Sequence, residues 1–137
     1  MIVVDASIAV AWFLDESHST FAASLLQGDP DLIAPDLMAA EVGSALVRAH
    51  RRKLIKDSEV SNGLAAIVSG LVTLHPTTPL LLGASAIACR HRCSIYDAAY
   101  LELARRTGRI LATDDARMAE IAGALSVQAH RPSDGLL

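Results

Sequence analysis

The stretch "MIVVDASIAVAWFL" (residues 1–14) places a short apolar run directly before a segment with helical spacing. Residues 1–4 are apolar and rich in β-branched side chains, which predicts a buried strand, whereas the apolar residues of 7–14 recur with the period of a helix. Asp5 lies at the junction. A buried strand that passes straight into a helix is typical of a parallel sheet covered by helices on both faces.

The same alternation of strand and helix continues along the chain. We predict further strands at residues 32–34, 72–75, 109–113 and 126–129, helices at 18–26, 35–50, 57–71, 80–92, 95–106 and 115–125, and a turn at 27–31. Asp36 is the expected N-cap of the helix at 35–50. The pattern predicts an α/β fold with a mainly parallel sheet, in which functional groups gather at the carboxyl ends of the strands. Asp5 and the pair Asp114 and Asp115 follow two such strands.

Length and composition exclude several classes of protein. A chain of 137 residues is the size of one domain, so we expect a single domain over residues 1–137. The net charge of -3 argues against a protein that coats nucleic acid through its whole surface. Charged residues and prolines interrupt the apolar runs, and the positive region of a signal peptide is missing. We therefore expect a cytoplasmic protein that does not contact a membrane.

The 15 acidic residues differ in their helical neighbours. Six have a basic residue three or four positions away and are expected to form exposed surface pairs: Asp57, Glu59, Glu102, Asp114, Glu120 and Asp134. Others, such as Asp15 and Glu16, have no such partner but lie in predicted turns, where water can solvate them. At the same spacings, only uncharged residues surround Asp5, Glu41, Asp97 and Asp115. A partly buried group of carboxylates is unfavourable unless a cation or protons neutralise it, and Mg²⁺ and Mn²⁺ prefer oxygen ligands of this kind. The pattern predicts a divalent metal site.

Each of these acids also has a purely structural interpretation. Asp5 could cap the helix that follows it, and Asp97 completes a Ser-x-x-Asp sequence that approximates a capping box. Asp115 could be an acid of a first helical turn, favoured by the helix dipole. Glu41 could reach solvent from the edge of its apolar stripe. The metal site and these structural roles remain open at this point.

Four segments together resemble the PIN-domain family: "VVDASIAVAWFL" (3–14), "APDLMAAEVGSAL" (34–46), "SIYDAAYLELA" (94–104) and "ILATDDARM" (110–118). Within that family the chain is similar to the small bacterial VapC-type toxins, because the segments span nearly its whole length. The resemblance implies a three-layer α/β/α domain, with a mainly parallel sheet, whose acidic pocket binds Mg²⁺ or Mn²⁺ and hydrolyses the phosphodiester backbone of RNA. It further implies a homodimer that a cognate antitoxin silences.

The resemblance also assigns residues to the expected site. Its catalytic and metal-binding acids match Asp5, Glu41, Asp97 and Asp115. The supporting hydroxyl groups match Ser7 and Thr113. The sequence "TDD" offers two acids where the family needs one; we expect Asp115 to be the site residue and keep Asp114 as a supporting one.

Basic residues near the predicted helix ends are candidates for guiding RNA toward an acidic site. They are Arg48, Arg51, Arg52, Lys53, Lys56, Arg90 and Arg92. The alternative is a solvated helix end whose positive charges are favoured by the helix dipole.

Two other functions remain open from the sequence. One is a binding module without catalysis, in which the acids are structural. The other is a phosphohydrolase that uses Asp5 as its nucleophile. Such an enzyme would usually have a second aspartate two positions later, where this chain has Ser7.

Overall fold

A parallel sheet of five strands forms the centre of the computed structural model, which describes residues 1–28 and 31–137. Across the sheet the strands are β3 (Thr73–His75), β2 (Leu32–Pro35), β1 (Ile2–Val4), β4 (Ile110–Ala112) and β5 (Ala129–His130). Every neighbouring pair is parallel. The predicted parallel sheet is confirmed, and Asp5 directly follows its central strand, β1.

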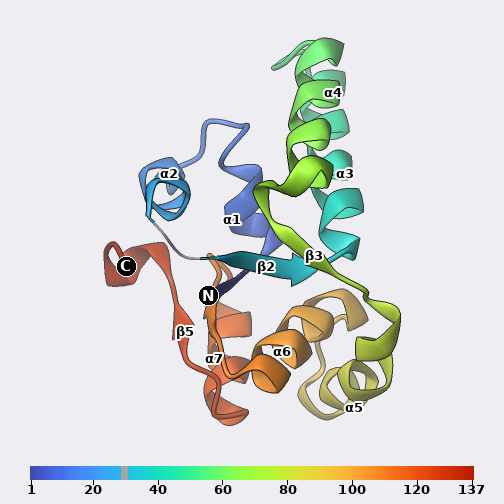
Figure 1. The fold of residues 1–137 in the computed structure, drawn as a ribbon, viewed down its shortest axis with the longest axis vertical. Helices are drawn as coiled ribbons and strands as arrows, with labels where there is room; N and C mark the ends of the chain where they lie inside the picture. Colours follow the sequence, from blue (N-terminus) through green and yellow to red (C-terminus); the bar gives the residue numbers. More distant parts are fainter. Residues whose placement is uncertain (29–30) are drawn as a thin grey trace.

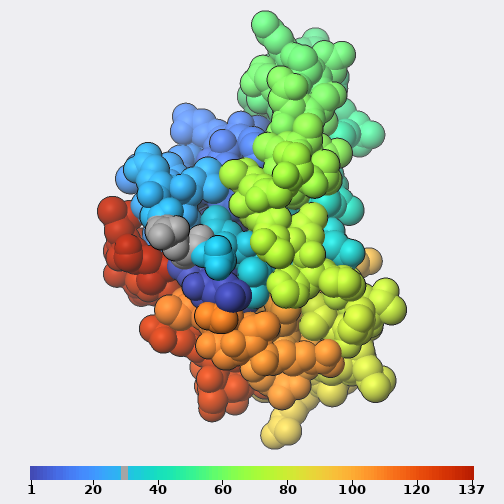
Figure 2. All heavy atoms as spheres, in the orientation of Figure 1, coloured from blue at the N-terminus to red at the C-terminus, as the bar shows by residue number. Residues whose placement is uncertain are grey.

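Helices cover the two faces of this sheet (Figure 1). One face carries α1 (Ala6–Val10), α2 (Ser19–Gln27), α3 (Leu37–Arg51) and α4 (Asp57–Ala66), and the other carries α5 (Leu81–His91), α6 (Ile95–Thr107) and α7 (Ala116–Ala124). The expected three-layer α/β/α arrangement is confirmed. The hairpin of α3 and α4 extends past the sheet as a ridge at the top of the molecule (Figure 2).

The three inner strands β1, β2 and β4 are almost completely buried, which explains their uninterrupted apolar sequences, whereas the edge strands β3 and β5 are partly exposed. Val3 and Val4 of β1, and Leu111 and Ala112 of β4, are fully inaccessible to solvent. Burying one valine or leucine side chain contributes about 1.5 to 3 kcal/mol. This packing holds β1 beside β4, in a register that pairs Val4 with Ala112.

Several element boundaries differ from the predicted ones. The first helix ends at Val10 rather than at residue 14, because the backbone then tightens into bonds between residues three apart. The predicted helix at 57–71 divides into α4 and a π-helical turn, η1 (Ile67–Leu71), and Gly70 adopts φ 115° inside that turn. Of the predicted turn at 27–31, residues 29–30 lie outside the described residues.

The last strand is also shorter and later than predicted. It covers Ala129–His130 instead of residues 126–129, because Ser126 adopts a positive φ of 58° that interrupts extended backbone. The predicted helix at 80–92 is preceded by a 3-10 turn, η2 (Thr78–Leu80), and is otherwise α5.

Asp36 occupies the N-cap position of α3 but does not cap it, so that prediction is wrong. Its carboxylate instead accepts hydrogen bonds from the backbone N and the Oγ1 of Thr77, at 3.1 and 2.6 Å. The Thr77 hydroxyl in turn accepts a bond of 3.1 Å from the backbone N of Leu37. The start of α3 is therefore held by a residue 41 positions away, which helical spacing cannot reveal.

Glu102 pairs with Arg105 and Arg106 as predicted, but its carboxylate is buried rather than exposed. Its side chain is 1% exposed and accepts bonds of 2.6 and 2.7 Å from Arg105 and Arg106. The carboxylate fits against α5 only because position 83 is a glycine: a Cβ there would lie 2.6 Å from the Glu102 carboxyl group. Glu102 thus joins α6 to α5 from the interior.

Within the described part of the chain, no helix is both long and apolar enough to cross a membrane.

Candidate active site

The carboxyl ends of β1 and β4 bring two distant segments into contact. The backbone N of Asp5 donates to the carbonyl of Ala112 at 3.0 Å, continuing the pairing of the two strands. The Thr113 hydroxyl, directly after β4, donates to Asp5 Oδ2 at 2.8 Å. Parallel strands of one sheet end at the same edge, so the predicted meeting of these segments follows from the topology.

Asp5 is a buried carboxylate held by two hydroxyl groups. It is 5% exposed, and the same oxygen, Oδ2, accepts from Ser7 Oγ at 2.7 Å and from Thr113. No side-chain bond from Asp5 caps α1, so the capping interpretation is wrong for this residue. Burial raises its pKa to about 6 against the opposing effect of the two hydroxyls, and the charge of Asp97 raises it further.

Glu41 projects from α3 toward the same region. It is half-buried, and its Oε1 accepts a hydrogen bond of 2.7 Å from the hydroxyl of Tyr100, a fully buried residue of α6. Burial raises the pKa of Glu41; the Tyr100 hydrogen bond opposes this rise, and the charges of Asp5 and Asp97 add to it. The same burial, with the charge of Glu41, raises the pKa of Tyr100. Glu41 therefore faces other acids rather than solvent alone.

Tyr100 is a site residue that the sequence prediction missed. It lies three positions after Asp97, and residues three apart share one face of a helix. That spacing was available in the sequence, within "YDAAYLELA". The prediction considered only the acids and the hydroxyl residues that match the family pattern, and Tyr100 entered it only as an uncharged neighbour of Asp97.

Asp97 lies in the first turn of α6 and shows half of the expected capping box. The Ser94 Oγ accepts a bond of 3.0 Å from the backbone N of Asp97, so Ser94 caps the helix. Asp97 itself is half-buried; burial and the charge of Asp115 raise its pKa, while hydrogen bonding by Ser94 opposes that rise.

Asp115 combines a structural role with a place beside the other acids. It is the N-cap of α7, and its Oδ1 accepts from the backbone N of Arg117 and of Met118 at 2.8 and 3.1 Å. Asp115 thus has a structural role, but as the N-cap of α7 rather than as the first-turn acid that the sequence suggested. Its negative charge nevertheless acts on Asp97, and its second oxygen is not engaged in capping.

The negative charges of the four acids act on one another, and no basic side chain of the described residues pairs with them. Asp97 interacts with Asp5, Glu41 and Asp115 through charge. In residues 1–28 and 31–137, none of the four acids forms an ion pair with a basic side chain. Over the same residues, no three acidic, histidine or cysteine side chains form a closed ligand set by themselves. The arrangement is a negative cluster open to solvent on one side.

Comparison with known proteins identifies the family of the chain. Residues 2–124 match the family model described as PIN domain. The chain belongs to the PIN-domain family. Ribonuclease VapC3 of Pyrobaculum aerophilum is 36% identical over 121 residues, which are 87% of this chain and 92% of the relative. Ribonuclease VapC12 of Mycobacterium tuberculosis is 35% identical over 126 residues, or 90% and 93% of the two chains.

Solved structures share the PIN-domain fold. The crystal structure of Mycobacterium tuberculosis VapC20, described as a sarcin-ricin loop cleaving toxin, has a TM-score of 0.73 and 19% identity, covering 88% of this chain and 94% of that one. FitAcB from Neisseria gonorrhoeae has a TM-score of 0.65 and 14% identity, covering 97% and 99%. The inferred resemblance to VapC-type ribonucleases is confirmed by the sequence relatives, and the fold by these structures.

The second acid of "TDD" is engaged differently from its prediction. Asp114 does not pair with Arg117, which instead contacts Glu120 at 3.1 Å. The Asp114 carboxylate lies 3.4 Å from His18 Nδ1. Its backbone N donates to Ser7 Oγ at 3.2 Å. Asp114 therefore contacts the segment around α1, beside Asp5, and its supporting role stays a prediction.

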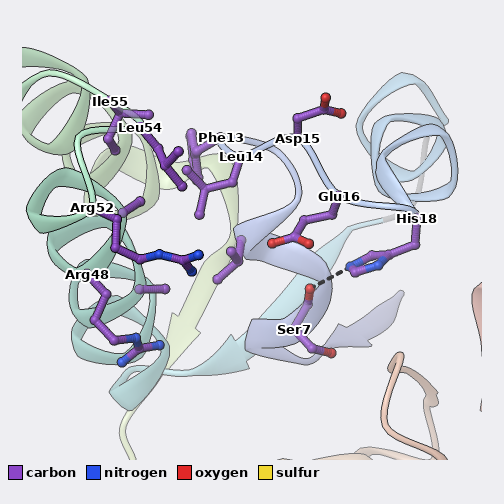
Figure 3. A pocket seen from close by; sticks show the side chains of 13 residues that line it. Ser7, Phe13, Leu14, Asp15, Glu16, His18, Arg48, Arg52, Leu54 and Ile55 are labelled. Atoms are coloured by element: carbon purple, nitrogen blue, oxygen red, sulfur yellow. Dashed lines mark hydrogen bonds between the residues drawn. The ribbon is translucent and has the colours of Figure 1, made fainter.

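A pocket of about 760 Å³ adjoins the PIN-domain site between α1 and α3 (Figure 3). Apolar side chains such as Phe13 form much of its lining. The side chains of Arg48 and Arg52 enter from α3 and its end, and Glu16 and His18 face them from the segment after α1 (Figure 3). The four acids do not line this pocket; Ser7, which does, links it to Asp5.

The predicted RNA-guiding residues are all exposed but lie in two separate places. Arg48, Arg51, Arg52 and Lys53 lie at the end of α3, on the projecting hairpin, whereas Arg90 and Arg92 lie at the end of α5, in the opposite layer (Figure 1). Nothing in the described structure neutralises Arg52, although Glu16 faces it (Figure 3). The basic residues therefore flank the acids from two sides rather than forming one patch.

Proposed function

We propose that this protein is a Mg²⁺- or Mn²⁺-dependent endoribonuclease, the toxin of a type II toxin–antitoxin pair, with one nuclease domain over residues 1–137. One observation supports it most strongly. Three acids, Asp5, Glu41 and Asp97, have pKa values raised by burial and by neighbouring negative charge, and none of them forms an ion pair with a basic side chain of the described residues. A cluster in that state gains from a bound cation more than an exposed cluster would.

The donor set fits a hard divalent ion. All candidate ligands are carboxylate oxygens, which Mg²⁺ and Mn²⁺ prefer. In the described residues no three such side chains form a ligand set by themselves, so water would have to complete the coordination of an ion held by one or two of these carboxylates. When bound, such an ion supplies a polarised phosphate and an activated water.

The residues of the chain would hold the ion, orient the attacking water and position one another. Asp5, Asp97 and Asp115 would hold the ion, directly or through water. Glu41, fixed by Tyr100, is placed to complete the negative charge and to orient the attacking water. Ser7 and Thr113 fix the rotamer of Asp5 by occupying one of its oxygens and leaving the other free to act as a ligand. No side chain is needed as a nucleophile.

RNA is the proposed substrate, because the relatives are named ribonucleases. A cluster of acids repels a phosphate backbone, so basic residues at its borders are required to bring RNA close. The exposed residues at the ends of α3 and α5 supply such charges on two sides of the site. We include Arg48, Arg51, Arg52, Lys53, Arg90 and Arg92 in this role.

A cognate antitoxin and a second copy of the chain are the proposed protein partners. The pocket beside the site has an apolar lining that a segment of an antitoxin could cover. Exposed apolar side chains on α5 and α6, Leu82 at 85% and Tyr96 at 58% exposure, support a self-associating face. Molar mass in solution, measured for the free protein and after Leu82→Glu, tests the dimer: the variant should be the smaller species.

Cleavage of total cellular RNA by the purified, antitoxin-free protein tests the nuclease. Wild type is compared with Asp97→Asn, each with Mg²⁺, Mn²⁺ or EDTA. Asp57→Asn, the same change at an exposed acid of α4, serves as the matched control. We expect discrete fragments from wild type and from the control, and none from Asp97→Asn or with EDTA. Folded proteins that never cleave under any condition would favour the binding module without catalysis.

A further inference from the structure

His18 occupies an unusual position between the pocket and the acidic site. It directly precedes α2, and its side chain is only 9% exposed. One ring nitrogen, Nε2, lies 2.9 Å from the carbonyl oxygen of Ser7, as Figure 3 shows. The other, Nδ1, lies 3.4 Å from a carboxylate oxygen of Asp114 without a hydrogen bond, so the two groups attract each other as an ion pair when the imidazole carries a proton on both nitrogens. A carbonyl only accepts hydrogen bonds, so Nε2 must be the donor in the contact with Ser7.

The two residues that His18 contacts are themselves joined. Ser7 Oγ donates to Asp5 Oδ2 at 2.7 Å and accepts from the backbone N of Asp114 at 3.2 Å. On the far side of the loop, Arg131 Nη2 donates to the Asp114 carbonyl at 2.9 Å. Ser7 and Asp114 thus fasten the junction after β1 to the junction after β4. His18 contacts one residue of each junction, Ser7 and Asp114.

These junctions carry two of the acids of the site. Asp5 begins the first one, and Asp115 follows Asp114 in the second. A group that binds both junctions limits how far the two carboxylates can move apart. Metal sites and catalytic sites depend on such outer contacts, because small displacements of the ligands weaken binding and catalysis.

We propose that His18 is a positioning residue of the acidic site, which fixes the junctions after β1 and β4 relative to each other through Ser7 and Asp114. The role of these junctions in metal binding and cleavage rests on the proposed function. The fastening of the junctions themselves does not. His18 touches neither the acids proposed to bind metal nor the expected position of the scissile phosphate.

Amide hydrogen exchange of the metal-free protein tests the fastening directly. His18→Ala removes both contacts, whereas His18→Gln keeps an amide donor near the position of Nε2. His50→Ala is the matched control, since His50 also contacts a single backbone carbonyl, that of Ile55 at 3.2 Å, but lies at the end of α3. We expect the amides of residues 113–115 to exchange about fivefold faster in His18→Ala, as for the loss of one hydrogen bond. They should exchange at the wild-type rate in His50→Ala and at an intermediate rate in His18→Gln, which keeps the contact with Ser7 but loses the one with Asp114.

Mn²⁺ affinity and steady-state kinetics on RNA then test the consequence. His18→Ala should bind Mn²⁺ about tenfold more weakly and lose about tenfold in kcat, with an unchanged KM for RNA, and His18→Gln, which keeps only the contact with Ser7, should recover part of both. Wild-type exchange rates at residues 113–115 of His18→Ala would overturn the proposal, whatever the Mn²⁺ affinity of that variant. So would a change confined to KM, which would make His18 an RNA contact in the pocket.

The two proposals can fail separately. If wild type neither binds Mn²⁺ nor cleaves RNA, the proposed function is wrong, and the exchange data alone decide whether His18 fastens the junctions. If wild type does both and the exchange in residues 113–115 is unaffected by His18→Ala, the function stands and the positioning role is refuted.

Discussion

Asp5→Asn should make the metal-free protein more stable at neutral pH while abolishing cleavage. Both hydroxyls that bind Asp5 donate to the same oxygen, Oδ2, which the amide oxygen of an asparagine can replace. The substitution therefore removes a buried charge and keeps the hydrogen bonds of Ser7 and Thr113. A stabilised and inactive variant is what we expect of a residue whose charge serves binding rather than folding.

The magnitude follows from the pKa of Asp5. Its value is raised from 3.8 to about 6 in the folded protein, and each unit corresponds to about 1.4 kcal/mol. The folded state holds the proton of Asp5 more tightly than the unfolded state does. The free energy of unfolding of the protein therefore falls as pH rises from about 4 to about 6 and is then level. The wild type should lose about 3 kcal/mol across that window through this residue, and the variant should not.

Urea unfolding at a series of pH values, with EDTA present, measures this difference. The free energy of unfolding of Asp5→Asn minus that of wild type should grow by about 2 to 3 kcal/mol between pH 4 and pH 7.5. Excess Mn²⁺ should then stabilise wild type at pH 7.5, by about 2.7 kcal/mol at a concentration a hundred times its Kd, but not the variant. A difference that does not change with pH, or a variant less stable than wild type at pH 7.5, would refute the reasoning.

Three further substitutions test other parts of the structure. Tyr100→Phe removes the donor that lowers the pKa of Glu41, so kcat should fall about tenfold and the acid limb of the pH–rate profile should move to higher pH. Gly83→Ala would place a Cβ against the buried Glu102 carboxylate and should cost about 2 kcal/mol in urea unfolding. Arg52→Ala should raise KM for RNA and reduce the slope of log affinity against log salt concentration by about 0.7, as for one lost phosphate contact.

Two controls keep these results specific. Tyr96→Phe changes an exposed tyrosine of the same helix and should leave the pH–rate profile unchanged. Gly123→Ala adds a Cβ that meets nothing within 4 Å, and it should be neutral or stabilise α7 by up to about 1 kcal/mol. Equal losses in Gly83→Ala and Gly123→Ala would contradict the account of Glu102, and an unchanged salt slope in Arg52→Ala would remove that residue from the RNA-guiding set.

The sequence predicted those parts of the fold and site that depend on local pattern. The strand at residues 1–4 and the following Asp5 could be recognised because a doubly covered strand has an uninterrupted apolar sequence. The meeting of Asp5 with Thr113 followed from the rule that parallel strands end together. The capping serine of α6 was visible because Ser94 and Asp97 are three residues apart.

Contacts between distant segments account for the incorrect predictions. Asp36 binds Thr77 and Asp114 contacts His18, and neither partner lies within one helical turn. Glu102 has the spacing of a surface pair, yet it is buried because Gly83 of another helix leaves room for it. Helical spacing identifies which residues are neighbours on one helix, but it contains no information on what covers that helix.

The position of β1 in the sheet determines when the site can assemble during synthesis. β1 lies between β2 and β4, and the hydroxyl that binds Asp5 comes from Thr113, 108 residues later in the chain. A growing chain that has not yet released β4 from the ribosome has Asp5 without this support and lacks Asp115. Parallel pairing over such a separation also forms slowly. Nuclease activity should therefore arise only after almost the whole chain has been made. Unfinished copies should then do little damage to the RNA of the ribosome that is producing them.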